Sequence, residues 1–525
     1  MASPTPPTRQ QRLWQRGNAH AAQLQWQQAA DCFRAIVAHA PDHVPALLKA
    51  SDTLLRLDHY RDARSHALRA GEQAPYLPRM LVEVCQRLRM FNETRRLRDI
   101  VGDASLEDCD DADVLTELAS LLSSAGDHAG ARSLIDRAVL AAPANPKPHY
   151  MRGVIALFQG DMACARQDLE LCVRLAPGFA QAHWVLSGLD RSEGDRQDDT
   201  ERVRTNLSRA SPGTLAEAYL AFALHNELHA SGRHEEAWQA LLRGCSVKRR
   251  LGRHDPRRVE ALFAKVRSLC TAEFVRPVVR DDDVTPIFII GMHRSGTTLL
   301  ERILAGHSQV TDGGETYGFT AQLDIAVDHK TSGALDVVTA DRLADADFEA
   351  IGRSFIEELR AHAAGRPFVT EKLPPNLVNA GFIAKALPNA RILHMVRDPR
   401  DTCFSNLRTY FNRTAAYSYD QLELTDYYRQ YRDLMRHWHA VMPGRILDVD
   451  YDELVAHPEA TASKVLAFCG LPFEPGTLSV GRQGAVATAS SAYVRSGILR
   501  NRGAAWKPYA DHLRPMLDAL KDMEG

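Results

Sequence analysis

The stretch PIFIIGMHRSGTTLLERIL, Pro286 to Leu304, decides the fold of the second half of this 525-residue chain. Its apolar residues 287–290 predict a buried parallel strand, and the sequence breaks at Gly291 before an amphipathic helix that begins at Thr297. The glycines at 291 and 296 let the backbone curl, so that N–H groups and the positive end of the helix converge on an anion. The stretch therefore predicts a phosphate cradle at the edge of an α/β sheet.

One position separates this loop from the loop of a nucleoside triphosphatase. The pattern GxxxxGK[ST] places a lysine where this chain has Thr297, and Arg294 lies inside the loop. Without the lysine that bridges the β- and γ-phosphates, ATP or GTP hydrolysis loses a main source of charge stabilisation. The sequence thus disfavours a P-loop kinase and indicates a phosphate or sulfate donor, bound by Arg294, Ser295, Gly296, Thr297 and Thr298.

Two further segments extend this site. In FVTEKLPPNLVNAGFIAKALPNARILHMVRDPRDTCFSN, residues 391–396 predict a strand, and Arg397 follows at its carboxyl end, before a helix that carries Ser405. Ligands bind outside the carboxyl ends of strands in open α/β sheets. The segment LDVDYDELVAHPEATASKVLAFCGL, residues 447–471, then predicts a strand, an aromatic residue and a helix.

These segments, in this order, resemble the sulfotransferase superfamily, whose 5′-phosphosulfate loop has the form GxxRSGTT and whose donor is 3′-phosphoadenosine 5′-phosphosulfate (PAPS). The resemblance covers about 240 residues, from Pro286 to the C-terminus. It implies that Arg397 and Ser405 bind the 3′-phosphate and that Tyr451 contacts the adenine. A loop that closes over the nucleotide would be ATASSAYVRSGILRNRGAAWKPY, with Arg495, Trp506 and Lys507 at the phosphates.

The offsets are similar to those of the tyrosylprotein sulfotransferase branch. That branch has a glutamate 21 residues after the loop arginine as its base and a lysine 25 residues before the 3′-phosphate arginine, which here are Glu315 and Lys372. Its serine ahead of the last basic loop matches Ser490. The resemblance implies that Glu315 takes the acceptor proton while Lys372 and Ser490 stabilise the leaving oxygen, with no metal. A phenol with a pKa near 10 suits a carboxylate base better than an aliphatic alcohol does.

The first half of the chain repeats every 34 residues. Three registers share this period. The first is Pro41, Pro75, Pro143 and Pro177, with Cys109 at the skipped position, and the second is Ala29, Ala63, Leu97, Ala131 and Ala165. The third is Asp58, Asn92, Gly126, Gly160 and Gly194, expected at tight turns with left-handed backbone angles. This period resembles the tetratricopeptide (TPR) family. Five repeats from about Trp14 to Leu207, and one more within 216–244, predict an all-α superhelix whose groove binds a protein or peptide. A structural helical shell is the alternative.

Length and composition set the remaining expectations. The predicted domains are a TPR array over 1–250, a linker over 251–284 and, over 285–525, a P-loop-like three-layer α/β sulfotransferase domain with a parallel sheet. A formal net charge of −2 does not suggest a nucleic-acid or membrane-surface binder. We expect a cytoplasmic protein without a membrane span, of bacterial type, with nine reduced cysteines. His437 and His439 in HWH should face different sides of a helix, so we expect no metal there.

The function that these patterns favour is a PAPS-dependent sulfotransferase acting on an acceptor hydroxyl, with tyrosine of a bound protein or peptide preferred. Two alternatives stay open at this point. One is a sulfotransferase for a small-molecule or glycan hydroxyl. The other is a TPR scaffold whose sulfotransferase-like domain binds nucleotide without turning it over.

Overall fold

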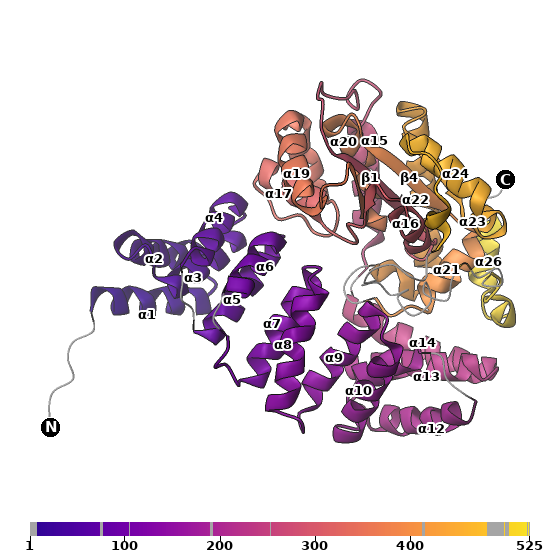
Figure 1. Cartoon of the computed structure of the whole chain (residues 1–525), viewed down its shortest axis with the longest axis horizontal. Coiled ribbons are helices and arrows are strands. Elements are labelled where there is room, and N and C mark those ends of the chain that lie inside the picture. Colours follow the sequence, from indigo (N-terminus) through magenta and orange to yellow (C-terminus); the bar gives the residue numbers. More distant parts are fainter. Residues whose placement is uncertain are drawn as a thin grey trace. The chain divides into compact units, whose positions relative to one another are not determined.

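The computed structural model describes residues 8–73, 77–103, 106–189, 193–252, 254–411, 415–479, 498, 503–521 and 523, with the side chains of 193–198 left aside. The chain forms two compact units, which Figure 1 shows coloured along the sequence. Unit 1 comprises Met1–Pro143 and Thr320–Ser332, and unit 2 comprises Ala144–Phe319 and Gly333–Gly525. None of the described helices combines the length and the apolar composition that a bilayer-spanning helix needs.

Unit 1 consists of helical pairs. Its described helices before residue 143 are α1 (Arg9–Ala22), α2 (Trp26–His39), α3 (Val44–Arg56), α4 (Tyr60–Gly71), α5 (Pro78–Met90), α6 (Thr94–Asp103), α7 (Ala112–Ser124) and α8 (His128–Ala141). Asp58, Asn92 and Gly126 have positive φ angles of 62°, 60° and 84°, as the 34-residue register predicts for the turns within pairs. The small residues Ala29 and Ala63 are fully buried, so the two helices of a pair can approach closely.

The segment Thr320–Ser332 of unit 1 comes from far along the sequence and carries most of α17 (Gly318–Val327). Ile325 packs against the cluster formed by α2, α3 and α4 around Tyr60. Asp328 accepts a hydrogen bond of 2.7 Å from the backbone N–H of Arg61, and His329 contacts Asp58. A stretch that follows Glu315 by only five residues is thus held by the second helical pair.

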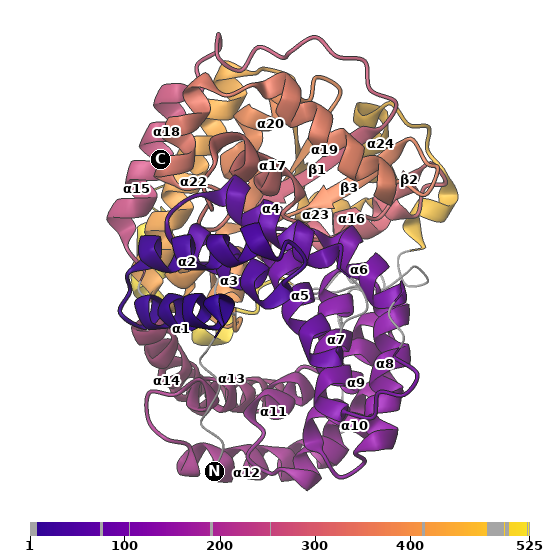
Figure 2. The same cartoon turned by 90° about the vertical axis from the view of Figure 1, so that its left-hand side faces the viewer.

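Unit 2 begins with further helices of the repeat region, namely α9 (Pro146–Gln159), α10 (Met162–Leu175), α11 (Ala180–Ser187), α12 (Glu193–Arg209), α13 (Leu215–Ala230) and α14 (His234–Gly252). Gly160 adopts the expected left-handed angle, with φ of 87°. Gly194 does not lie at a turn, because it falls inside α12. Helices α13 and α14 lie side by side as a pair (Figure 2).

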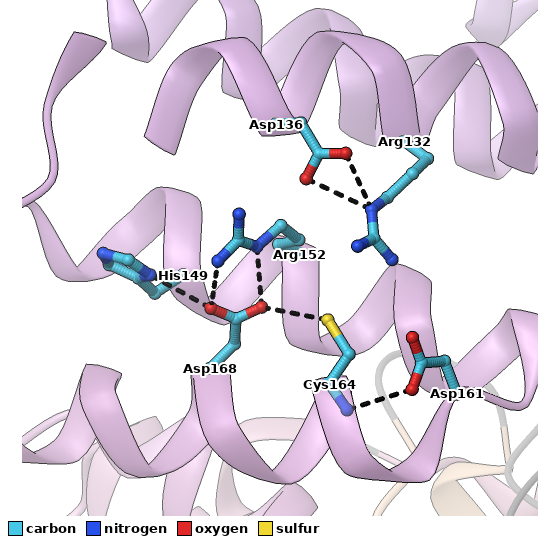
Figure 3. Close-up of polar contacts among 7 residues, drawn as sticks. All are labelled: Arg132, Asp136, His149, Arg152, Asp161, Cys164 and Asp168. Atoms are coloured by element: carbon cyan, nitrogen blue, oxygen red, sulfur yellow. Dashed lines mark hydrogen bonds and ion pairs between the residues drawn. The ribbon is translucent and has the colours of Figure 1, made fainter. Parts of the chain in front are cut away.

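A buried carboxylate joins α9 to α10. Asp168 on α10 is 2 % exposed and accepts hydrogen bonds of 2.7 Å from both Nε and one Nη of Arg152, which lies on α9. His149 and Cys164 also direct polar atoms at this carboxylate (Figure 3). Because the charge of Asp168 is paired and hydrogen-bonded, its burial is tolerated inside this helical pair.

The expected linker is not without structure. Residues 251–284 contain α15 (Pro256–Leu269), which begins at a proline and is capped by the side chain of Asp255. Helix α14 ends within the first residues of this range, at Gly252. The domain limits of 1–250 and 285–525 stay predictions, since the compact unit that holds the sheet also holds α9 to α15.

The sheet of unit 2 has five parallel strands in the order β2-β3-β1-β4-β5. These are β1 (Thr285–Gly291), β2 (Val310–Thr311), β3 (Phe368–Lys372), β4 (Arg391–Val396) and β5 (Ile446–Asp450). Strand β1 is central and pairs with β3 and β4. Its neighbour β4 is visible beside it in Figure 1. Because the strands are parallel, their carboxyl ends share one edge, as the sequence predicts.

Helices cover both faces of this sheet. The remaining described helices of unit 2 are α16 (Thr297–Ala305), α18 (Val337–Arg342), α19 (Phe348–His362), α20 (Ala380–Ala386), α21 (Pro399–Leu407), α22 (Gln421–Val441), α23 (Tyr451–Ala456), α24 (Pro458–Cys469) and α26 (Arg514–Lys521). Leu393 and Met395 of β4 share a buried cluster with α16, α23 and α24. On the other face, Phe288 stacks with Phe355 of α19 at 5.7 Å. The three-layer α/β fold is therefore confirmed.

The pair α13–α14 packs against this layered domain within unit 2. Tyr219 of α13 stacks on Tyr410, with ring centroids 4.0 Å apart, and the ammonium of Lys248 lies 4.2 Å from the centroid of the same ring. Arg249 of α14 donates to Glu423 of α22 at 2.6 Å. Since Lys248 is only 4 % exposed, its aliphatic stem and its charge are both covered by this packing.

Candidate active site

The donor loop, residues 291–296, joins β1 to α16 and fits tightly against its surroundings. Gly291 has φ of 148°, and a Cβ atom there would lie 2.8 Å from a carbonyl oxygen of β4. Gly296 has φ of 107°, and a Cβ atom there would collide with the ring of Tyr451. Arg294 also takes a positive φ, 67°. The two glycines therefore allow the close backbone approach that a phosphate cradle requires.

The hydroxyl residues at the end of the loop and at the start of α16 are buried. Ser295, Thr297 and Thr298 are 1 %, 5 % and 6 % exposed. Ser295 donates its hydroxyl hydrogen to the carbonyl of Met292 at 2.8 Å, so it supports the loop conformation itself. Burial lowers the pKa of His293, within the loop, to about 4, which keeps this imidazole neutral at pH 7. Apart from Arg294, the loop therefore presents uncharged donors.

Residues from three other segments meet the loop. Arg294 donates from Nε to Oγ of Ser405 at 3.2 Å, and Arg397 donates to the backbone carbonyl of Arg294 at 3.3 Å. The guanidinium of Arg397 lies 4.5 Å from the centroid of the Tyr451 ring. Two arginines, a serine and an aromatic ring thus converge at the carboxyl ends of β4 and β5, as the sequence predicts. This arrangement can bind a phosphate next to a stacked base.

The expected base and its lysine lie in direct contact. Lys372 is the last residue of β3 and is opposite Ile289 of β1 in the strand register. Its side chain is fully buried and donates to Oε1 of Glu315, whose side chain is 41 % exposed. The backbone N–H of Lys372 donates to the carbonyl of Gly314 at 3.0 Å. The strand end therefore fixes the turn that carries Glu315.

A buried carboxyl group beneath this pair was not anticipated from the sequence. Glu301 of α16 is 3 % exposed, and its Oε1 accepts hydrogen bonds of 3.2 Å from the backbone N–H of Gly314 and from the hydroxyl of Thr370. Burial, together with the nearby charge of Asp312, raises the pKa of Glu301 to about 8. The one sequence signal that could have indicated this buried carboxyl is the position of Glu301 among the apolar residues of LLERIL, residues 299–304.

A second buried carboxyl group lies on β3 itself. Glu371 is 2 % exposed and accepts a hydrogen bond of 2.9 Å from the amide of Asn376. Burial raises its pKa to about 8. Strongly perturbed carboxyl groups gather at functional sites. Here Glu301 lies 3.9 Å from the ammonium of Lys372, and Glu371 precedes Lys372 on β3.

The C-terminal candidates are placed in part. Trp506 lies beside Arg400, whose guanidinium carbon is 5.3 Å from the centroid of the indole ring. Lys507 is exposed at the start of a short 3₁₀ helix, η6 (Lys507–Tyr509). Ser490 and Arg495 lie outside the described residues. The described geometry thus brings Arg397, Ser405 and Tyr451 together with Arg294 of the donor loop. It joins Glu315 to Lys372 in a second group. The arginine that Trp506 contacts, Arg400, comes three residues after Arg397 in the chain.

Part of the chain is similar to known proteins of one family. Residues 286–475 match the model of the sulfotransferase family. A protein-tyrosine sulfotransferase of Drosophila melanogaster is 29 % identical over 205 residues, which cover 37 % of this chain and 39 % of that protein. Protein-tyrosine sulfotransferase A of Caenorhabditis elegans is 29 % identical over 222 residues, which cover 38 % of this chain and 55 % of that protein.

A longer match joins the chain to an uncharacterized protein of Aquifex aeolicus (strain VF5), with 27 % identity over 350 residues, or 64 % of this chain and 46 % of that protein. The chain thus spans about half the length of the curated relatives that it matches. Among solved structures, a sulfotransferase domain from the curacin biosynthetic pathway covers 46 % of this chain and 99 % of its own, with 18 % identity and a TM-score of 0.31. A tetratricopeptide repeat protein from Parabacteroides merdae covers 45 % of this chain and 93 % of its own, with 11 % identity and a TM-score of 0.35.

The C-terminal half of the chain therefore contains a sulfotransferase-family domain, and helical repeats of TPR type precede it. Because the family match begins at residue 286, one residue after the start of β1, it includes the donor loop and extends past α24.

Proposed function

We propose that this chain is a PAPS-dependent sulfotransferase that transfers a sulfuryl group to an acceptor hydroxyl, with tyrosine of a protein or peptide as the preferred acceptor. The single observation that carries this proposal is the convergence described above. Arg294, Ser405 and Arg397 gather beside Tyr451, while Lys372 and Glu315 meet at the neighbouring strand end. Family membership of the domain supports the same reaction class.

Each group has a role in the proposed binding of the donor. The donor loop and Arg294 hold the 5′-phosphosulfate through backbone N–H groups, hydroxyls and one positive charge. Arg397 and Ser405 hold the 3′-phosphate, and the ring of Tyr451, already stacked with Arg397, contacts the adenine. A second phosphate site of this kind distinguishes an adenosine 3′,5′-bisphosphate from an ordinary adenine nucleotide.

The chemical step is an in-line displacement at sulfur. The acceptor oxygen forms a bond to sulfur as its proton passes to the carboxylate of Glu315, and the bond between sulfur and the 5′-phosphate oxygen breaks. The leaving group is the 3′,5′-bisphosphate, whose departing oxygen gains negative charge that Lys372 and Ser490 stabilise. In the structure Lys372 contacts Glu315, so donor binding must draw the ammonium toward the phosphosulfate and release the carboxylate to act as a base.

The helical repeats have a separate proposed role, which is to bind a protein or peptide and bring it to the enzyme. Repeat arrays usually offer a long groove in which extended segments bind. We place the enzyme in a cytoplasm, because the odd number of nine cysteines with no CxxC pair suits a reducing compartment.

The test is a transfer assay with ³⁵S-labelled PAPS and a panel of acceptors. Labelled product from a tyrosine peptide, and none from the same peptide with phenylalanine, is the expected result. Transfer only to carbohydrates or small phenols would favour the small-molecule alternative. Tight bisphosphate binding without any transfer would favour a scaffold that has lost turnover.

A further inference from the structure

Two histidines and an aspartate from three elements converge on the face of the sheet that α22 covers. His394 of β4 and Asp448 of β5 are partners in the strand register, and Nδ1 of His394 lies 2.7 Å from Oδ1 of Asp448. His439, near the end of α22, brings Nε2 to 3.0 Å from the same oxygen. One potential ligand atom of each residue lies within 4.8 Å of the other two.

This spacing is close to that of a metal site. Zinc binds imidazole nitrogen and carboxylate oxygen at about 2.0–2.2 Å, so ligand atoms around a tetrahedral ion lie roughly 3.3 Å apart. The two measured separations, 2.7 Å and 3.0 Å, need only a few tenths of an ångström of expansion to admit an ion. His439 and Asp448 are 38 % and 51 % exposed at their side chains, which leaves room for water as a further ligand.

The surroundings of His394 also suit a ligand. Its second ring nitrogen, Nε2, contacts the hydroxyl of Tyr431, which is buried on α22. If Nδ1 binds an ion, Nε2 carries the hydrogen and donates it to this hydroxyl oxygen, a partner that fixes the ring and its tautomer. His437, two residues before His439, points elsewhere and binds the carbonyl of Cys270 at 2.9 Å. His437 and His439 thus point in different directions, as expected, but His439 shares its partner Asp448 with His394.

We propose that His394, His439 and Asp448 form a binding site for a divalent transition-metal ion of the zinc type, completed by water. Two imidazoles and one carboxylate are a ligand set that Zn²⁺, Co²⁺ and Ni²⁺ accept. Such an ion ties the end of α22 to β4 and β5. It takes no part in sulfuryl transfer, because Leu393 and Met395, which alternate with His394, face α16 on the opposite side of the sheet.

The competing explanation is a hydrogen-bond network, in which both imidazoles donate to Asp448 and no ion binds. The full-length protein, treated with chelator and dialysed, is therefore titrated with ZnCl₂ by calorimetry and with CoCl₂ by visible absorption. His439→Ala is the variant, since this side chain is half-exposed and its loss leaves the core intact. His437→Ala is the matched control on the same helix. We expect one Zn²⁺ per chain, d–d bands of protein-bound Co²⁺, and a rise of the unfolding temperature by about 3 °C or more at saturating Zn²⁺.

His439→Ala should weaken Zn²⁺ binding by at least about tenfold and abolish the Co²⁺ bands, whereas His437→Ala should leave both unchanged. Asp448→Asn gives an independent second test, because the amide keeps a hydrogen-bond acceptor but loses the anionic ligand. Equal Zn²⁺ binding by wild type and His439→Ala would assign the ion to other groups and overturn the proposal. So would a loss of unfolding temperature in His439→Ala that is the same with and without Zn²⁺, since that result is expected of the hydrogen-bond network alone.

Discussion

The ammonium nitrogen of Lys372 lies 3.9 Å from Oε2 of Glu301, while the same nitrogen donates directly to Glu315. One lysine thus faces two carboxyl groups of different character. Burial, with the nearby charge of Asp312, raises the pKa of Glu301 to about 8, so below this pH Glu301 is mostly neutral and does not draw the ammonium of Lys372 away from Glu315. Above it, Glu301 competes with Glu315 and the donor for Lys372.

The first prediction follows from this competition. Wild-type turnover should fall as the pH rises through about 8, and Glu301→Gln, which mimics the neutral carboxyl, should lose much of this alkaline decline. A carboxyl whose pKa is higher in the folded state than in the unfolded state destabilises the fold as the pH rises from its unfolded value toward 8. The unfolding free energy of Glu301→Gln should therefore depend less on pH over that range. Matched pH profiles of rate and of denaturant unfolding measure both.

Glu474→Gln is the control, because this half-buried carboxyl contacts Ser308 and His307 and has no described contact with Lys372. If Glu301→Gln keeps the wild-type alkaline limb in both profiles, Glu301 does not set the charge at Lys372.

Much of the layered domain was predictable from the sequence, because its strands and helices leave patterns within short stretches of the chain. The apolar run before Gly291 and the helix start at Thr297 were placed correctly because a buried strand and an amphipathic helix each leave a periodic pattern. The 34-residue period located residues such as Ala131 and Ala165, both fully buried in their helical pairs. Arg294, Arg397, Ser405 and Tyr451 were named from the resemblance to the sulfotransferase superfamily, and the structure brings them together, while their role in binding a donor stays a prediction.

Features that depend on contacts between distant segments were not predictable. From the sequence alone, Glu301 is an ordinary charged residue of a helix. Its burial depends on contacts with Thr370 of β3 and with the turn at Gly314, which lie elsewhere in the chain. The packing of Ile325 on the second helical pair, and the meeting of His394 with His439, likewise leave no pattern in the sequence. Gly194 failed as a turn because the 34-residue register does not continue into α12.

The second prediction concerns the donor. Adenosine 3′,5′-bisphosphate should bind far better than AMP or ATP, because AMP leaves the 3′-phosphate partners Arg397 and Ser405 without an anion, at a cost of roughly 2–5 kcal/mol. Arg397→Ala should reduce the preference for the bisphosphate over AMP, while Arg400→Ala, three residues along and paired with Asp398, should not. Isothermal titration calorimetry without Mg²⁺ measures each affinity. Equal affinities of the wild type for AMP and the bisphosphate would remove the assignment of a 3′-phosphate site.

The third prediction separates the base from donor binding. Glu315→Gln keeps the size of the side chain and still accepts a hydrogen bond from Lys372, but it cannot take a proton at neutral pH. We expect turnover to fall by ~10²–10⁴-fold, with bisphosphate affinity within a few-fold of wild type. Lys372→Ala should lower turnover and also weaken donor binding somewhat. Near-normal turnover of Glu315→Gln in the ³⁵S assay would assign the base to another residue.

The last prediction concerns how much of the helical region the sulfotransferase-family domain needs. A chain that starts between Thr271 and Pro286 keeps the whole family match but loses all the helices before it, including α13 and α14. That cut removes the ring stacked on Tyr410 and the ammonium above it, and it takes His229 away from the hydroxyl of Tyr509, a contact of 2.8 Å. An aromatic face left exposed to water in this way favours aggregation.

We therefore expect the short chain to be insoluble or unable to bind the bisphosphate, whereas a chain that starts at Ala144 and keeps α9 to α14 should be soluble and should bind it. In the full-length protein, Tyr219→Ala should lower the unfolding temperature, since it deletes one partner of the stacked pair. Sedimentation of the two truncated chains measures their solubility, and calorimetry measures their affinity for the bisphosphate. Together they decide whether the helices are needed for folding or for recruitment of the acceptor. If the short chain is soluble, binds the bisphosphate normally and only loses activity on a protein acceptor through a higher KM, the helices that it lacks act in recruitment and are not required for folding.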